Sequence, residues 1–137
     1  MSEFDYDVVV IGSGPAGHHA AIQSAKLRKR VMIVERKPIV GGVCINIGTI
    51  PSKTMREAVL YLSGHREHAV YGESYRVKEK IAFRDLLYRI EPVVRHEIDV
   101  SRHQLLRNGV ELVYASAAFA DQHSVHLSFA DETGART

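Results

Sequence analysis

Two segments of this 137-residue chain combine residue types and spacings that can do chemistry. The first is a glycine-rich turn at residues 12–17, with the sequence Gly-Ser-Gly-Pro-Ala-Gly. The second is residues 41–53, which hold the one cysteine of the chain, Cys44, together with the hydroxyl of Thr49 and the ammonium group of Lys53. The first pattern is typical of a site for the pyrophosphate of a dinucleotide. The second needs a comparison with other sequences before its chemistry can be interpreted.

Each glycine of the turn has its own physical reason. Gly12 permits the tight turn, Gly14 lets the backbone approach a pyrophosphate, and Gly17 lets the next helix lie against the preceding strand. The N-terminus of that helix then presents free N–H groups and a partial positive charge to the anion. The cofactor-binding residues expected in this segment are Gly12, Ser13, Gly14, Pro15, Ala16 and Gly17.

An acidic residue stands at the matching place further along the chain. Glu35 ends a second predicted strand about 20 residues beyond the turn, where a carboxylate can accept hydrogen bonds from the adenosine ribose. A carboxylate disfavours a 2′-phosphate, so NADP is not expected in this pocket. The neighbouring Arg36 is also expected to bind the cofactor. The motif does not separate FAD from NAD. The alternative is a turn that only packs, with Glu35 as a solvated strand end.

The surrounding pattern predicts an α/β fold. Residues 6–11 and 31–35 read as apolar strands of a parallel sheet covered on both faces, and residues 15–28 as the helix that joins them. Residues 110–114 read as a further apolar strand, and residues 36–49 as a glycine-rich loop. A helix is expected at about residues 50–63, and residues 64–79 are expected to be irregular. The result is a Rossmann-like βαβ unit with a parallel sheet.

Apolar residues at helical spacing predict a long amphipathic helix from Phe83 to Leu105. Pro92 lies inside this pattern and should bend the helix or mark a second start. Residues 124–129 alternate apolar and polar, which indicates a half-exposed strand of a small antiparallel meander. A turn at residues 131–134 would lead to a further strand. We therefore expect that the sequence is a piece of a longer protein.

Composition narrows the class of protein. A hydrophobic content of 45% supports one core, and a formal charge of +2 argues against a nucleic-acid platform. The chain has no apolar run near the roughly 18 residues that span a bilayer. A single cysteine excludes a disulfide framework and fits a reducing, cytoplasmic location. The histidines, including the adjacent His18 and His19, are interpreted as surface residues, and no metal site is expected.

Residues 12–17 and 41–53 together resemble the signature of the FAD-dependent pyridine nucleotide–disulfide oxidoreductases. In that family a second cysteine lies five places after the first, and here Thr49 occupies the place. The chain is in this respect similar to the soluble, Si-specific pyridine nucleotide transhydrogenases, which lack the second cysteine. The resemblance implies that residues 1–137 are the N-terminal part of an FAD-binding domain. NAD-binding and dimerisation domains would lie outside this chain.

The resemblance also implies site residues and substrates. FAD would be the cofactor, NADPH and NAD⁺ the substrates bound by regions outside this chain, and the complete protein a homo-oligomer. The catalytic candidates are Thr49, Lys53 and Cys44. For Cys44 we favour another interpretation, in which the thiol is an evolutionary remnant of the family's cysteine pair and not a catalyst. The further cofactor-binding residues that the resemblance implies are Gly42, Val43, Cys44, Gly48, Thr49 and Lys53.

The missing sulfur limits the chemistry. A dithiol couple needs two sulfurs close enough to bond, and a threonine hydroxyl cannot form that bond. Electrons should therefore pass directly between a flavin and nicotinamides, which predicts hydride transfer between NADPH and NAD⁺. Two alternatives remain open: a disulfide reductase that receives a second thiol from elsewhere, and a folded FAD-binding segment without turnover. We expect the isolated 137 residues to be inactive and to bind FAD weakly.

Overall fold

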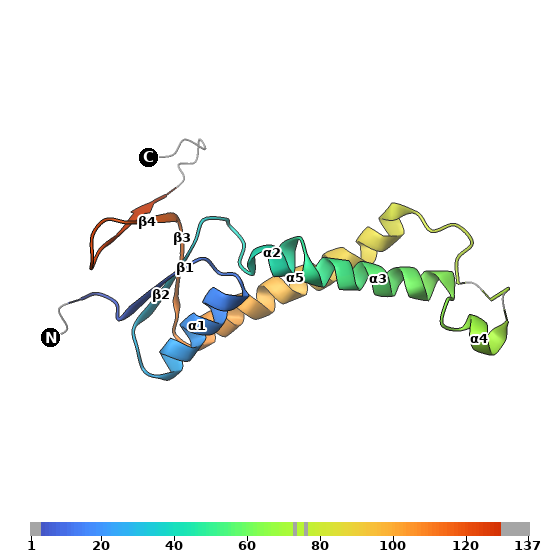
Figure 1. Ribbon diagram of the computed structural model, residues 1–137, viewed down its shortest axis with the longest axis horizontal. Helices are drawn as coiled ribbons and strands as arrows, with labels where there is room; N and C mark the ends of the chain where they lie inside the picture. Colours follow the sequence, from blue (N-terminus) through green and yellow to red (C-terminus); the bar gives the residue numbers. More distant parts are fainter. Residues whose placement is uncertain (1–3, 73, 76, 130–137) are drawn as a thin grey trace. The chain divides into compact units, whose positions relative to one another are not determined.

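The structure is a computed structural model that describes residues 4–72, 74–75 and 77–129. It forms two compact units, of which the first comprises Met1–Gly42 with Ile98–Thr137 and the second Val43–Glu97. In chain order the elements are β1 (Val8–Ile11), α1 (Pro15–Lys26), β2 (Val31–Glu35), α2 (Gly42–Asn46), α3 (Thr49–Ser63), α4 (His68–Tyr71), α5 (Phe83–Arg107), β3 (Glu111–Tyr114), β4 (Ser116–Phe119) and β5 (Val125–Ser128), as labelled in Figure 1.

The first unit is built on a parallel sheet with the strand order β1-β2-β3. Val8 pairs with Val31 at the start of β1, and Met32 pairs with Glu111 at the start of β3. Every residue of the central strand β2 is buried, as a run of branched apolar residues covered on both faces requires. The predicted βαβ unit with a parallel sheet is confirmed, and α1 is its crossover helix (Figure 1).

Helices cover one face of this sheet. Ala21 of α1 and Leu105 of α5 are fully buried against Val31 and Ile33 of β2. The small side chain of Ala21 lets α1 lie close to the strands, and Leu105 fills the space between the helix and the sheet. This layer holds α1 over β1 and β2, and so also holds the turn between β1 and α1.

A two-stranded antiparallel hairpin covers the other face. In the hairpin β4 pairs with β5, and Ala117 and Leu127 face each other. Met32, Val34 and Ala115 form the core of this layer, with Ala117 and Leu127 packed against them. The strand predicted at residues 124–129 is confirmed as β5, whereas β4 was missed because its sequence, Ser-Ala-Ala-Phe, does not alternate between apolar and polar residues. The turn predicted at residues 131–134 lies outside the described residues.

Two details of the first unit differ from the prediction. β1 begins at Val8 and not at residue 6, and its residues are half-buried or exposed, because β1 is an edge strand of the described sheet. The helix expected at residues 15–28 ends at Lys26, since Arg28 adopts a left-handed backbone with φ of 60°. That conformation ends the helix before the next strand begins.

The second unit is helical, and it corrects three expectations. The region predicted as a loop at residues 36–49 contains the short helix α2, and α3 begins at Thr49. The irregular region contains one short helix, α4. Helix α5 continues through Pro92, so the alternative of a second helix start there is wrong. Among the described residues, none of the helices combines the length and the apolar character that a membrane span requires.

The interpretation of His18 as a surface residue is wrong. Its side chain is only 9% exposed, and its Nε2 atom lies 3.3 Å from the backbone oxygen of Ser101 on α5. The neighbouring His19 is exposed, as predicted. Burial lowers the pKa of His18, and this effect outweighs the opposite influence of the Ser101 carbonyl. The neutral imidazole therefore joins α1 to α5.

This burial predicts a pH-dependent stability. Because the folded pKa of His18 lies below its unfolded value, protonation favours the unfolded chain, and stability falls as pH drops through about 6.5. Thermal unfolding followed by circular dichroism between pH 7.5 and 5.5 should show this loss. His18→Gln should flatten the pH profile, and His103→Gln, at an exposed position on α5, should leave it unchanged. Equal profiles for both variants would show that His18 is not the group responsible.

Adjacent leucines at the end of α5 test the helical layer. Leu105 is fully buried, whereas Leu106 is 52% exposed. Leu105→Ala should lower the free energy of unfolding by about 2–5 kcal/mol, because it removes buried methyl groups and leaves a cavity. Leu106→Ala should cost less than about 1 kcal/mol. Urea unfolding measures both, and similar losses would contradict the packing described.

Candidate functional site

The glycine-rich turn begins where β1 ends and is held against β2. The Gly12 N–H donates to the Val34 carbonyl at 2.7 Å, and Gly12 has a φ of +96°, a conformation that favours glycine. A Cβ atom added to Gly17 would lie 2.0 Å from the Gly12 carbonyl oxygen and 3.1 Å from Val10. Gly17 therefore permits α1 to start directly against the turn, as the sequence predicts.

Gly14 has different surroundings. A Cβ atom added there would meet nothing within 4 Å, so the space beside its backbone is open. Gly14 is the N-cap residue of α1, has no side-chain cap, and is followed by Pro15 at the first helical position. The N–H groups of this helix end and the positive end of its dipole would be available to an anion, because no side chain caps them. These features fit a dinucleotide pyrophosphate.

Ser13 and Glu35 form a buried polar pair beside the turn. The Ser13 hydroxyl donates to Oε2 of Glu35 at 2.6 Å, and the Ser13 backbone N–H donates to the same oxygen at 2.9 Å. The Lys37 backbone N–H donates to the other oxygen, Oε1, at 3.0 Å. The exposed fractions are 1% for Ser13 and 8% for Glu35. The carboxylate is thus held by the turn. The alternative interpretation, in which Glu35 is a solvated strand end, does not fit this burial and these hydrogen bonds.

The hydrogen bonds keep this carboxylate ionised. Burial alone raises the pKa of Glu35, but the hydrogen bonds from Ser13 and from the backbone of Lys37 and Arg36 together bring the pKa below its usual value. A charged carboxylate is an acceptor only. Glu35 can therefore accept a hydrogen bond from a ribose hydroxyl, and its charge disfavours a phosphate at the same place.

Two glycines after β2 pack on the turn. The Gly41 N–H donates to the Ser13 carbonyl at 3.1 Å and lies 3.3 Å from the Ser13 hydroxyl oxygen. A Cβ atom added to Gly42 would lie 2.9 Å from the Gly14 Cα, so Gly42, expected to bind the cofactor, also has a packing role. No site role was predicted for Gly41. The Gly-Gly pair was the available signal, since both residues have positive φ.

The predicted site residues fall in both units. The glycine-rich turn, Glu35 and Gly42 come together in the first unit, as described above. Arg36 also belongs to the first unit, and its side chain is exposed. The remaining predicted residues belong to the second unit, which is described by itself: Val43, Cys44, Gly48, Thr49 and Lys53.

In the second unit these residues lie on α2, on α3 and in the turn that joins the two helices. The Gly48 N–H donates to the Val43 carbonyl at 2.7 Å, which closes α2 before α3 starts at Thr49. Thr49 and Lys53 are both exposed and stand one helical turn apart, so they share a face of α3. Cys44 is partly exposed. With one cysteine among 137 residues, no disulfide can form within the chain.

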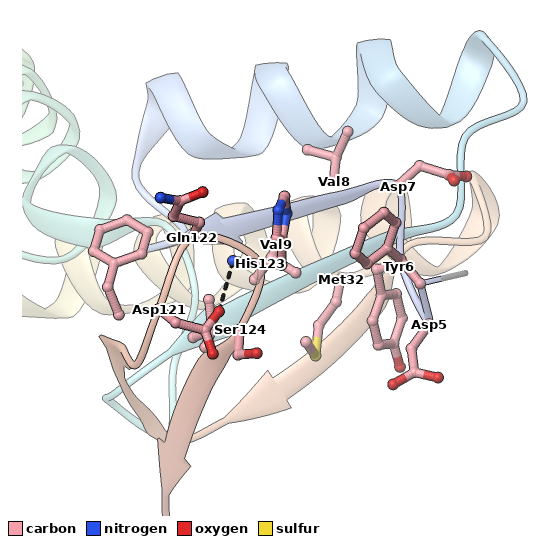
Figure 2. Close-up of a pocket in the computed structure, with 13 residues that line it drawn as sticks. Asp5, Tyr6, Asp7, Val8, Val9, Met32, Asp121, Gln122, His123 and Ser124 are labelled. Carbon is pink, nitrogen blue, oxygen red and sulfur yellow. Dashed lines mark hydrogen bonds between the residues drawn. The ribbon is translucent and has the colours of Figure 1, made fainter. Parts of the chain in front are cut away.

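A separate cleft of about 660 Å³ lies in the first unit (Figure 2). The residues before and within β1 line it together with the turn between β4 and β5, and Met32 contributes from β2. The His123 N–H donates to the Asp121 carboxylate at 2.7 Å on this turn, as Figure 2 shows. Asp7 forms an ion pair with Arg30 at 3.0 Å. None of the predicted site residues lines the cleft.

Comparisons with known proteins agree with this geometry. The chain is 57% identical over 121 residues to the soluble pyridine nucleotide transhydrogenase of Mycobacterium bovis, covering 88% of this chain and 26% of that protein. It is 38% identical to the protein of the same name from Colwellia psychrerythraea, covering 93% of this chain and 27% of that protein. The chain thus spans about a quarter of the length of these relatives.

A solved structure is also similar. It is the Cu(II) complex of the HOCl-induced flavoprotein disulfide reductase RclA from Escherichia coli, with a TM-score of 0.68 and 28% identity. The similarity covers 87% of this chain and 24% of that one. The family described as pyridine nucleotide-disulphide oxidoreductase matches residues 6–134. With this match and the geometry of the glycine-rich turn, the chain belongs to the pyridine nucleotide-disulphide oxidoreductase family.

Proposed function

We propose that the protein binds FAD and transfers hydride from NADPH to NAD⁺, or in the reverse direction. The observation that carries this proposal is the open backbone at Gly14 beside the uncapped N-terminus of α1, with the ionised Glu35 tied to the same turn. A pyrophosphate and a ribose are the two groups that these features suit. Together they are parts of the adenosine half of FAD.

The second step of the proposal is the choice between nicotinamides and a thiol substrate. A flavin supplies two-electron hydride chemistry when bound. A dithiol relay beside it would need two sulfurs, and Thr49 stands five places after Cys44, where this chain offers a hydroxyl. The relatives at 57% and 38% identity carry the name of a transhydrogenase. Both observations support transfer between two nicotinamides.

The residues of the chain have separate roles in this proposal. The turn and the start of α1 bind the pyrophosphate through backbone N–H groups, and Glu35 binds the adenosine ribose. Thr49 supplies a hydroxyl that can donate or accept a hydrogen bond, and Lys53 supplies positive charge from the same face of α3. Cys44 has no partner sulfur in the chain and takes no part in electron transfer.

The partners follow from the same proposal. NADPH and NAD⁺ would be bound by a part of the complete protein that these residues do not include, because the chain spans about a quarter of the relatives. We propose that the complete protein is a homo-oligomer in the cytoplasm. Residues 1–137 would be the N-terminal part of its FAD-binding domain.

A disulfide reductase is the second candidate, and one observation favours it. The similar structure from Escherichia coli is named a flavoprotein disulfide reductase. That activity in the present protein would require a second thiol from outside residues 1–137. A long-wavelength charge-transfer band on partial reduction would indicate a thiolate against the flavin and would support this candidate.

Alanine substitutions at Gly14 and Gly17 distinguish an effect on FAD binding from an effect on folding. Gly14→Ala should leave the free energy of unfolding within about 1 kcal/mol of the original, because its φ of −65° suits alanine and the space is open. It should weaken FAD binding at least about tenfold, since the Cβ atom enters the space proposed for the pyrophosphate. Flavin fluorescence of the natural-length protein measures this affinity.

Gly17→Ala is the matched control. Its Cβ atom would overlap the Gly12 carbonyl oxygen, so it should destabilise the fold by about 1–3 kcal/mol or more. Unchanged FAD affinity in a folded Gly14→Ala protein would contradict the proposed binding site.

Cys44→Ala tests the route of the electrons. The natural-length variant should transfer hydride from NADPH to a thionicotinamide analogue of NAD⁺ within about threefold of the original rate, because no sulfur takes part. The appearance of the reduced analogue is followed by absorbance. A loss of activity in the variant would contradict the proposal, as would faster reduction of a disulfide substrate than of the analogue by the unaltered protein.

A further inference from the structure

A small hollow, here called the basic hollow, lies between α1 and the end of α5, apart from the residues assigned to FAD. We propose that the basic hollow binds a phosphate-type anion, either inorganic phosphate or the phosphate group of a small monoester. Its volume is about 280 Å³, below the roughly 300–1,000 Å³ of sites for drug-sized ligands, so its ligand is small. The inference does not depend on FAD binding at the glycine-rich turn.

Two stretches of the first unit line the basic hollow. On α1 the lining residues at positions 18, 22 and 26 are four apart, so they share one face of the helix. At the end of α5 the lining residues at positions 104, 107 and 108 are three and four apart, which also places them on one side. The polar members of the lining are His18, His19, Lys26, Gln104, Arg107 and Asn108.

The charge of the basic hollow is positive. No acidic side chain is among the described residues that line it, and within the described part of the chain neither Lys26 nor Arg107 forms a salt bridge. Each cation stands in the last turn of its helix, where it balances the roughly half negative charge of the helix end. Two cations against two such ends leave about one positive charge, which an anion can neutralise.

The donors of the basic hollow suit an anion with more than two oxygens. The Asn108 side-chain amide donates one N–H to the Gln104 carbonyl at 2.8 Å, which holds the amide in place and leaves its second N–H for another acceptor. The Arg107 guanidinium is a planar fork that matches two phosphate oxygens, and the Lys26 ammonium adds a compact charge. A phosphate can meet donors from three side chains at once, whereas a carboxylate has only two oxygens.

The buried part of the lining joins the two helices. His18 is 9% exposed, and its Nε2 atom lies 3.3 Å from the Ser101 backbone oxygen of α5. The His19 ring meets the His18 ring edge-on, with the ring centroids 5.6 Å apart. These contacts hold α1 beside the end of α5 without a ligand. A hollow that exists before binding lowers the entropic cost of ordering its side chains around an anion.

Phosphate binding is measured by isothermal titration calorimetry of the natural-length protein as purified, at about pH 7.5, with chloride keeping the ionic strength constant. We expect saturable binding with a Kd on the order of 1 mM. Lys26→Gln and Arg107→Gln should each weaken it about fivefold, the size of a partly exposed ion pair, and the double variant about twentyfold or more. The matched control is Arg102→Gln, an exposed cation of α5 outside the hollow, with an effect below about twofold.

The same titration with glycerol phosphate and with acetate identifies the class of ligand. Glycerol phosphate that binds at least as tightly as inorganic phosphate would assign the basic hollow to monoesters, and weaker binding would assign it to inorganic phosphate. Acetate should bind at least about fivefold more weakly than inorganic phosphate, because it meets fewer donors. Acetate that binds as tightly as phosphate would contradict the proposed class.

Thermal unfolding separates an anion site from simple stabilisation of the helix ends. A cation that only balances a helix end changes Tm equally with and without phosphate, whereas loss of the site removes the rise in Tm that phosphate causes. Equal phosphate binding by the original protein and the double variant, or no saturable binding by the original, would overturn the inference. Neither result bears on the proposed function, which is tested by FAD affinity and hydride transfer.

Discussion

The buried hydrogen bonds between Ser13, Glu35 and Gly41 are the interaction on which the proposed site depends. They join three segments that are separate in sequence: the turn after β1, the end of β2 and the loop after it. An unpaired carboxylate in such a place would be costly, and here each of its oxygens accepts a hydrogen bond from the protein. The same bonds that stabilise the turn also keep the carboxylate charged.

Steric limits act together with this polar cluster. The turn can close only because Gly17 leaves room for the Gly12 carbonyl and Gly42 leaves room for Gly14. The packing of α1 and α5 over the sheet, through Ala21 and Leu105, then holds the helix in place. What remains open is the backbone at Gly14. The fold thus supplies a rigid frame with space on one side, which is the condition for binding a pyrophosphate through backbone groups.

Much of this arrangement could be predicted from local sequence. The valine-rich strands, the glycine spacing and the acid at Glu35 each have a short-range signal, and they define the parallel βαβ unit. Other features depend on contacts between distant segments, which a sequence pattern does not show. His18 is buried because α5 passes beside it, and β4 forms because it pairs with β5. The same reason explains the role of Ser13, whose hydroxyl bonds to Glu35, 22 residues further along the chain.

In the proposed function, the glycine-rich turn and Glu35 hold the adenosine end of FAD. A crystal structure of the natural-length protein with FAD tests this directly. We predict a pyrophosphate against the backbone of Gly14, a Ser13–Glu35 hydrogen bond that persists, and a ribose hydroxyl that donates to the Glu35 carboxylate. A pyrophosphate bound elsewhere, or a ribose that does not contact Glu35, would contradict the proposed site.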